Sequence, residues 1–259
     1  MAVDGSQSIS VIIPVLNNAE GLERCLSSVF AQNYNELEII IIDGGSNDGT
    51  LDVIKKHESK INYWESGEDS GISSAFNRGL RVTTGELVAI LNSDDQWANT
   101  TVESVLKFAE SDPLADLYCG QIRFLDMTTG RSYLRSPSLE RMSKRMNLFH
   151  PAMFVRRQCY QTVGPYNESY SMAMDAEWIH RAIKLRMRFS IVDKVLATMS
   201  LQGRSDLNYG VSLREYKRSL LSHGLSSNFN ANLYYVIFWA LKSFTRFLPI
   251  RLIKQFLFR

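Results

Sequence analysis

The first 115 residues alternate between short apolar runs and segments whose apolar residues recur at helical spacing, which limits the folds open to the chain. Runs rich in Ile, Val and Leu occupy residues 8–16, 37–42 and 86–91. Residues 19–32, between the first two runs, carry Leu, Cys, Val and Phe on one helical face. Alternating strands and helices predict an α/β protein with a parallel, right-handed, doubly wound sheet.

The second half of the chain is less regular, and we divide the chain on that basis. Residues 1–225 are predicted to form one domain with halves 1–115 and 116–225, followed by a C-terminal helical segment over 226–259. Asn17 with Glu20 resembles a capping box at the start of the first helix. The other elements that we expect are helices over 50–57, 73–83, 157–163 and 211–222, helices opening at Thr100 and Asp175, and strands over 61–65, 116–125, 149–156 and 188–199.

Two adjacent carboxylates, Asp94 and Asp95, follow the apolar run 86–91 directly. In open α/β sheets, ligands bind just beyond the carboxyl ends of such strands. The two acids repel each other unless a positive charge lies against them, and a hard divalent cation shared with phosphates is the natural candidate. The alternative is that one aspartate caps the following turn.

Composition excludes several classes of protein. The 259 residues are 45% hydrophobic with a net charge of +2, which argues against disorder and gives no whole-protein argument for nucleic acid binding. Three widely separated cysteines indicate reduced thiols in the cytosol. We expect no signal peptide. The longest apolar run, residues 233–241, is about half the length that spans a bilayer.

Asp43 ends the second apolar run and is followed by the glycine-containing loop 44–50. Its carboxylate suits hydrogen bonding to a base or ribose, and the loop can present backbone amides to a ligand. An ordinary strand-to-helix turn favours the same residues. A Rossmann NAD site is rejected, because residues 16–19 lack the glycine fingerprint that should follow the first strand.

Four segments occur in order: Ser10-Val-Ile-Ile-Pro14-Val-Leu-Asn17, Ile41-Ile-Asp43-Gly-Gly-Ser46-Asn-Asp-Gly-Thr50, Asp69-Ser-Gly71-Ile-Ser-Ser-Ala-Phe-Asn77-Arg-Gly79 and Gly85-Glu-Leu-Val-Ala-Ile-Leu-Asn-Ser-Asp94-Asp95. In this order and register they resemble the successive signatures of family-2 glycosyltransferases. The resemblance covers roughly the first hundred residues and implies a GT-A fold, a nucleotide-sugar donor, a divalent metal (Mn or Mg) and inversion at the anomeric carbon. It is closest to bacterial surface-polysaccharide enzymes, with residues 1–115 as the donor half and 116–225 as the acceptor half.

The resemblance also implies roles for particular residues. Asp95 would bind the metal at the pyrophosphate, and Asp94 would face the ribose or the metal. The other residues assigned to the donor are Pro14, Leu16, Asn17 and Asp43, which would line the nucleotide pocket, and Asp69 and Arg78, which would lie near the donor.

Two positions depart from the family pattern. Asn92 stands where many members have another aspartate, so the acid-rich segment keeps only Asp94 and Asp95. Gly44 replaces the second aspartate of the common Asp-Asp-Gly-Ser sequence, which often contacts uracil. The second departure weakens the inference that the base is uracil.

The second half of the chain should supply a base for the acceptor hydroxyl. Asp175 resembles the base of the family, although Asp is also a favoured N-cap residue. Glu177 is the alternative, but a helical turn would point it elsewhere. We interpret His150 as structural, with contact to acceptor or phosphate as the alternative. Arg204 matches a loop that in relatives lies near donor phosphates.

The C-terminal segment combines five basic residues and no acidic one between Lys242 and Arg259. After Pro249, a helix would separate an apolar face from a basic face, as in helices that lie on anionic membranes. At roughly 1 kcal/mol per basic residue, such a segment gives reversible attachment. Packing on the domain or in an oligomer is the alternative.

These inferences predict a cytoplasmic glycosyltransferase, peripheral on the inner face of the plasma membrane. It would move a hexose from a nucleoside-diphosphate sugar, with UDP favoured, to a saccharide acceptor that is lipid-linked, in O-antigen or capsule synthesis. The alternatives are a non-catalytic sugar-nucleotide-binding or membrane scaffold protein and a sugar nucleotidyltransferase. A nucleotidyltransferase should carry a glycine-rich, basic loop after the first strand, which Leu16-Asn17-Asn18 does not resemble.

Overall fold

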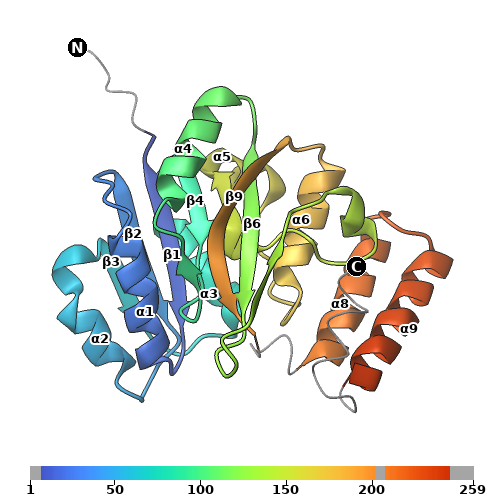
Figure 1. Ribbon diagram of the computed structural model, residues 1–259, viewed down its shortest axis with the longest axis horizontal. Helices are drawn as coiled ribbons and strands as arrows, with labels where there is room; N and C mark the ends of the chain where they lie inside the picture. Colours follow the sequence, from blue (N-terminus) through green and yellow to red (C-terminus); the bar gives the residue numbers. More distant parts are fainter. Residues whose placement is uncertain (1–6, 202–207, 246–259) are drawn as a thin grey trace.

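The computed structural model describes residues 7–201 and 208–245, and a nine-stranded sheet lies at the centre of that part of the chain (Figure 1). The strand order is β3-β2-β1-β4-β8-β6-β9-β5, with β7 beside β6. The strands are β1 (Ile9–Val15), β2 (Leu37–Asp43), β3 (Tyr63–Ser66), β4 (Leu87–Ile90), β5 (Gln96–Trp97), β6 (Leu117–Leu125), β7 (Ser132–Arg135), β8 (Met153–Arg156) and β9 (Phe189–Ser200).

The sheet is mostly parallel, as predicted for a GT-A fold. Strands β1, β2, β3, β4, β6 and β9 run in one direction, whereas β5, β7 and β8 run in the other. The first four of these form the regular, fully parallel half of the sheet. The reversed strand β8 lies between β4 and β6, so the regular half ends at β4.

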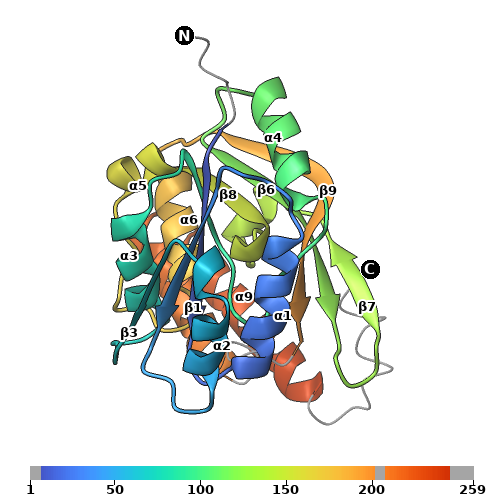
Figure 2. The same cartoon turned by 90° about the vertical axis from the view of Figure 1, so that its left-hand side faces the viewer.

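Helices cover both faces of the sheet (Figure 2). One face carries α1 (Ala19–Phe30), α2 (Thr50–Lys56) and α4 (Thr101–Ser111), and the other carries α3 (Ile72–Val82), α5 (Arg157–Val163) and α6 (Met174–Lys184). Helices α8 (Tyr209–Ser222) and α9 (Asn228–Thr245) lie at one end of the molecule (Figure 1). Short 3-10 turns occupy Glu58–Lys60, Glu140–Ser143 and His150–Ala152.

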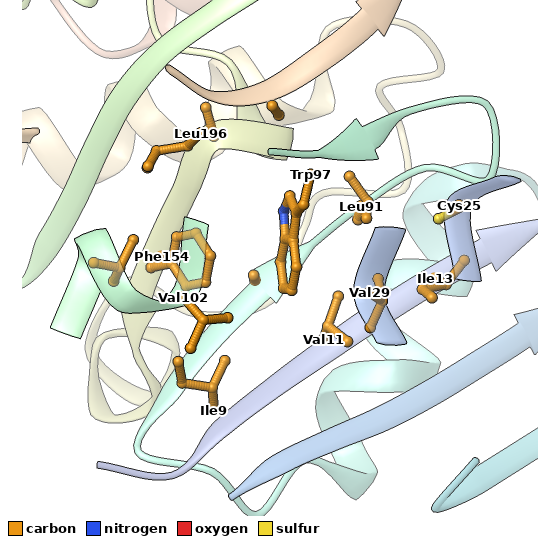
Figure 3. Close-up of a cluster of buried hydrophobic side chains, with 14 of the residues drawn as sticks. Ile9, Val11, Ile13, Cys25, Val29, Leu91, Trp97, Val102, Phe154 and Leu196 are labelled. Carbon is orange, nitrogen blue, oxygen red and sulfur yellow. The ribbon is translucent and has the colours of Figure 1, made fainter. Parts of the chain in front are cut away.

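Strand β1 is buried along its whole length because alternate side chains enter two cores. Ile9, Val11 and Ile13 face the core beneath α1 and α4, and Ile12 faces the core beneath α3. Figure 3 shows the first of these cores, where Trp97 stacks on Phe154 at a ring distance of 5.2 Å. The indole of Trp97 thereby anchors the segment that follows the acid pair.

Most predicted elements are confirmed within a few residues, with three differences. The prediction that Asn17 caps α1 is wrong: Asn18 accepts the N–H of Gly21, and Glu20 pairs with Arg24 instead. The predicted strand 149–156 begins as a 3-10 turn, because Pro151 has no N–H to donate to a sheet. Strands β5 and β7 were not predicted.

The C-terminal part of the chain is helical through residue 245, as expected for the start of the segment 226–259. None of the helices in the described ranges is long and apolar enough to cross a bilayer. The predicted helix after Pro249 lies outside the described residues. The domain boundary at residue 225 stays a prediction.

Glycine at position 79 permits close packing of α3 on β1. A Cβ atom at Gly79 would lie 2.4 Å from Ile12 Cγ2, whereas a Cβ atom at Gly210, in α8, would meet nothing nearer than 3.8 Å. We therefore predict that Gly79→Ala lowers the free energy of unfolding by about 1–3 kcal/mol, because Ile12 is fully buried and must shift. Gly210→Ala should leave it unchanged or raise it by up to about 1 kcal/mol. Urea denaturation measures both, and equal effects would contradict the packing argument.

Candidate active site

The predicted donor residues gather where the strand order reverses. Strand β1 has β2 on one side and β4 on the other, and all three run in the same direction. Their carboxyl ends therefore meet at one edge of the sheet, the position at which open α/β sheets bind ligands. The register pairs Val15 with Asp43, so the loops after β1 and β2 start side by side.

Asp43 is fully buried at the end of β2, and its two oxygens have different surroundings. Oδ2 accepts hydrogen bonds from the backbone N–H groups of Gly45 and Ser46, both at 3.0 Å, and from Ser66 Oγ at 2.6 Å. Oδ1 is buried with no hydrogen-bond partner among the described residues. One oxygen therefore shapes the turn, and the other is a buried acceptor whose hydrogen-bonding capacity is unused among the described residues.

Asn17 connects the loops after β1 and β2. Its backbone has φ +50°, in the left-handed region that Asn tolerates. Its N–H donates to Ser46 Oγ at 2.7 Å, and its Oδ1 accepts from the Asn47 N–H at 2.9 Å. The next residue, Asn18, donates from Nδ2 to Ser93 Oγ at 3.0 Å. These bonds fix the two loops to each other and to the acid-pair segment.

Leu16 and Asp69 converge on Gly44. A Cβ atom at Gly44 would lie 3.2 Å from Asp69 Oδ2 and 3.4 Å from Leu16 Cδ1. An aspartate at position 44 would thus bring a second carboxylate against Asp69. A side chain at position 44 would therefore have to share this space with Asp69 and Leu16.

Arg78 and Pro14 have structural surroundings. Arg78 Nε donates to Glu65 Oε1 at 2.7 Å, and Nη1 donates to the carbonyl of Gly67 at 3.1 Å. The guanidinium therefore braces the segment that leads to Asp69. Pro14 is buried within β1, opposite Ile42 of β2. A donor contact by either residue stays a prediction.

The acid pair, Asp94 and Asp95, follows β4, which ends at the same edge of the sheet. Asp95 is 1% exposed, and neither its Oδ2 nor the Oδ1 of Asn92 has a partner in the part of the chain that the structure describes. Asp94 is half-buried, and its backbone carbonyl accepts from Ser200 Oγ at 3.1 Å. Burial, with the charge of Asp94 adding to it, raises the pKa of Asp95 well above its usual range. Burial, followed by the charges of both acids, also raises the pKa of the nearby Cys25 thiol.

A hard divalent cation fits these residues. Buried oxygens without partners are costly, and carboxylate and amide oxygens are ligands of Mg²⁺ and Mn²⁺. Within residues 7–201 and 208–245, no cluster of three His, Cys, Asp or Glu side chains could hold a metal. Further ligands would therefore come from phosphate and water, as is usual for Mg²⁺ bound with a nucleotide.

Asp175 lies in the first turn of α6, and His150 faces it. The Oδ1 of Asp175 accepts from the Ala176 N–H at 2.7 Å, and Oδ2 lies 3.4 Å from His150 Nδ1. The Nε2 of His150 is buried without a partner in the described ranges. Sequence reasoning treated His150 as structural and missed this pairing, because the two residues are 25 positions apart.

The start of α6 is held from another helix. The carboxylate of Glu215, in α8, accepts the backbone N–H groups of Ser171, Met172 and Ala173 at 2.8–2.9 Å. Burial acts to raise the pKa of Glu215, but these hydrogen bonds together lower it. Asp175 is therefore not the N-cap of α6, which is Ala173, and the capping alternative for Asp175 does not apply.

Glu177, the alternative base, is engaged elsewhere. Its buried carboxylate pairs with Arg181, with Nε and Nη2 each 2.9 Å from an oxygen, and with His223 Nε2 at 3.1 Å. An acid held in this way stabilises the packing of α6 and has no oxygen directed to a substrate. Arg204 lies outside the described residues.

Structural comparison identifies the fold. The fold is similar to that of GT-A glycosyltransferases, including residues 1–349 of Staphylococcus aureus TarS in complex with UDP-GlcNAc (TM-score 0.67, 18% identity, 92% of this chain and 73% of that chain). It is also similar to the mannosyltransferase PcManGT from Pyrobaculum calidifontis in complex with GDP-Man and Mn²⁺ (TM-score 0.64, 18% identity, 87% and 68%).

Sequence comparison then gives the family. Residues 10–179 match the model of glycosyl transferase family 2, so the chain belongs to that family. A PGL/p-HBAD biosynthesis glycosyltransferase of Mycobacterium bovis is 32% identical over 172 residues, which are 64% of this chain and 66% of the relative. Glycosyltransferase AglE of Haloferax volcanii is 30% identical over 67% of this chain and 60% of its own length. The matches span about two thirds or less of these relatives.

The buried acid pair should make stability depend on pH. Because the folded-state pKa of Asp95 is raised, the folded protein binds this proton more tightly than the unfolded chain, and stability falls as pH rises above the unfolded value. Asp95→Asn removes this loss. We predict that Asp95→Asn is more stable than the parent in EDTA at neutral pH, and that the difference shrinks toward about pH 4.

Urea denaturation across that pH range measures the difference. Asp52→Asn, which changes an exposed residue of α2, controls for removing a surface charge. A difference between Asp95→Asn and the parent that stays constant with pH would contradict the raised pKa.

Proposed function

We propose that this protein transfers a hexose from a nucleoside-diphosphate sugar, with UDP as the favoured nucleotide, to a saccharide acceptor in cell-surface polysaccharide synthesis. Membership of glycosyl transferase family 2 supports the reaction class. The observation that carries the proposal is the buried, unpartnered Asp95 Oδ2 beneath the edge where β1, β2 and β4 end. A buried carboxylate beside a second acid needs a cation, and a diphosphate leaving group supplies the cation's remaining ligands.

The loops after β1 and β2 would bind the nucleoside. Asp43 offers Oδ1 as an acceptor for a base or ribose group, and Asn17 holds the loop that surrounds it. Leu16 is 46% exposed beside Gly44, so its side chain can cover the face of a base. Asp69, whose Oδ2 lies 3.2 Å from where a Cβ atom at Gly44 would stand, would supply a carboxylate in the same part of the pocket.

Asp95 and Asp94 would hold Mn²⁺ or Mg²⁺ at the pyrophosphate. The bound metal would supply positive charge that stabilises the departing nucleoside diphosphate. Asn92, whose Oδ1 is also buried and unpartnered in the described part of the chain, stands beside this pair as a neutral oxygen donor. One fewer negative charge at this position reduces repulsion within the acid segment.

Asp175 would act as the general base in an inverting displacement. Its Oδ2 takes the proton of an acceptor hydroxyl as that oxygen attacks the anomeric carbon from the face opposite the leaving group. The new carbon–oxygen bond forms while the bond to phosphate breaks, and the electron pair leaves with the nucleoside diphosphate. His150, 3.4 Å from Asp175 Oδ2, would position the carboxylate.

The acceptor is proposed to be lipid-linked, with the protein cytoplasmic and peripheral on the inner face of the plasma membrane. The basic and apolar composition of residues 242–259 supports this placement.

A non-catalytic scaffold is the second candidate, and Asn92 is the observation that favours it. Incubation with Mn²⁺ and a panel of sugar nucleotides, with and without saccharide acceptors, separates the two functions. Acceptor-stimulated release of nucleoside diphosphate is the result expected of a transferase. Binding of sugar nucleotide without release under every condition would support the scaffold.

Replacement of the proposed base should separate catalysis from binding. We predict that Asp175→Asn lowers the rate of transfer by about 10²–10⁴-fold while donor binding is retained, because general-base catalysis contributes that much. Asp52→Asn, in an exposed part of α2, is the control and should keep full activity. Near-normal turnover by Asp175→Asn would show that another group takes the proton.

Removal of the metal should weaken nucleotide binding. We predict that EDTA raises the Kd for UDP by about tenfold or more, a loss of roughly 1.4 kcal/mol, because the cation that would join the diphosphate to the acid pair is removed. Added Mn²⁺ should restore binding to the parent but not to Asp95→Asn. Titration calorimetry measures both, and metal-independent binding of UDP would contradict the cation site.

A further inference from the structure

Helix α9 is apolar around most of its circumference, yet only one of its faces is packed. Ala231 is buried, and Tyr235 lies beneath Lys217 of α8, whose Nζ is 4.6 Å from the ring centroid. Lys217 also reaches Asn232 Oδ1 at 3.2 Å. These contacts fix α9 against α8 along the side that carries Ala231 and Tyr235.

The opposite side of α9 exposes a stripe of large apolar residues. Phe229 is 75% exposed, Leu233 44% and Val236 57%, and their i, i+4, i+7 spacing places them in one row. Ile237 and Trp239 flank the row and are also exposed. A contiguous apolar patch of this kind on a folded protein marks an interaction site.

The charge of the surrounding sequence identifies the partner. From Tyr216 to Arg259 the chain has no Asp or Glu and seven Lys or Arg residues. An apolar helix face within a basic, acid-free segment matches an anionic lipid surface, where apolar side chains enter the acyl boundary and basic groups attract headgroups. Trp239 suits the same boundary, because indole rings favour membrane–water interfaces.

The position of α9 leaves this face open. Figure 1 shows α9 as the last element at one end of the molecule, with α8 between it and α6. In the same view, β1 and α9 both end at the lower edge. The exposed side chains of α9 therefore belong to an element at the end of the described part of the molecule.

We propose that the exposed face of α9, defined by Phe229, Leu233, Val236, Ile237 and Trp239, docks this protein on an anionic lipid bilayer. This inference goes beyond the proposed function, because it assigns membrane contact to a folded surface before residue 246. It rests on the proposed function only in that a lipid-linked acceptor would be reached there. Vesicle binding tests it without any measurement of transfer.

The experiment measures co-flotation of the full chain with vesicles of phosphatidylcholine alone or of phosphatidylcholine mixed with phosphatidylglycerol. We expect binding to the mixed vesicles that weakens at high salt, and weaker binding to neutral vesicles. The variant Phe229→Gln/Leu233→Gln/Val236→Gln should lower the partition coefficient for mixed vesicles by about tenfold or more, since each replacement removes apolar side-chain carbon from the bilayer contact. Glutamine keeps the helix propensity.

The matched control changes three exposed apolar residues elsewhere, Leu114→Gln/Met127→Gln/Leu134→Gln, and should bind as the parent does. A second comparison, Arg251→Gln/Lys254→Gln, tests the C-terminal tail. Both α9 and tail variants should keep the parent's melting temperature and UDP affinity, so that loss of vesicle binding is distinct from loss of the nucleotide site. If only the tail variant loses binding, α9 is not the docking surface.

The fluorescence of Trp239 reports directly whether α9 enters the bilayer. Of the four tryptophans, Trp97 and Trp178 are buried and Trp64 is half-buried, so Trp239 is the exposed one. Brominated lipids in mixed vesicles should quench its fluorescence, and Trp239→Phe should abolish that quenching. Absence of quenching would overturn the proposal. A second result would also overturn it. In analytical ultracentrifugation without lipid, the parent would be a dimer and the α9 variant a monomer, while both bind vesicles equally well.

Discussion

The parallel pairing of β1 with both β2 and β4 is the constraint on which the candidate site depends. This pairing brings three strand ends to one edge, and side-chain hydrogen bonds then tie the three loops together. Asn17 connects to Ser46, and Asn18 connects to Ser93. A loop that is bonded at both neighbours loses little further freedom when a ligand arrives, which favours binding. The hydrogen bonds that join the loops at this edge of the sheet therefore also hold the candidate site in place before a ligand binds.

The acid pair works against the stability of the fold that contains it. A buried carboxylate oxygen without a partner raises the free energy of the folded state, and Oδ2 of Asp95 is such an oxygen, enclosed beside Asp94. The surrounding apolar core, with Trp97 stacked on Phe154 directly after the pair, supplies the packing that holds this arrangement. Strain of this kind is typical of binding sites, where the missing interaction is the one that the ligand provides.

Much of the fold could be predicted from local sequence, because the period of apolar residues sets strands and helices without reference to distant contacts. The positions of Asp43 and the acid pair could be predicted in the same way, because each follows an apolar run that forms β2 or β4. The pairing of His150 with Asp175 could not be predicted, since it depends on how the 3-10 turn before β8 packs against α6. The reversed direction of β8 and the close approach of Asp69 to Gly44 likewise depend on tertiary structure.

The family match ends at residue 179, but the proposed base depends physically on residues beyond it. Glu215 accepts three N–H groups just before α6, and those groups have no carbonyl of the preceding turn to bond with. Helix α8 therefore fixes the angle at which α6 begins, and with it the carboxylate of Asp175. Helix α8 also packs against α9, through Lys217 on the ring of Tyr235 and on Asn232. Helix α8 is thus the element that contacts both the start of α6 and helix α9.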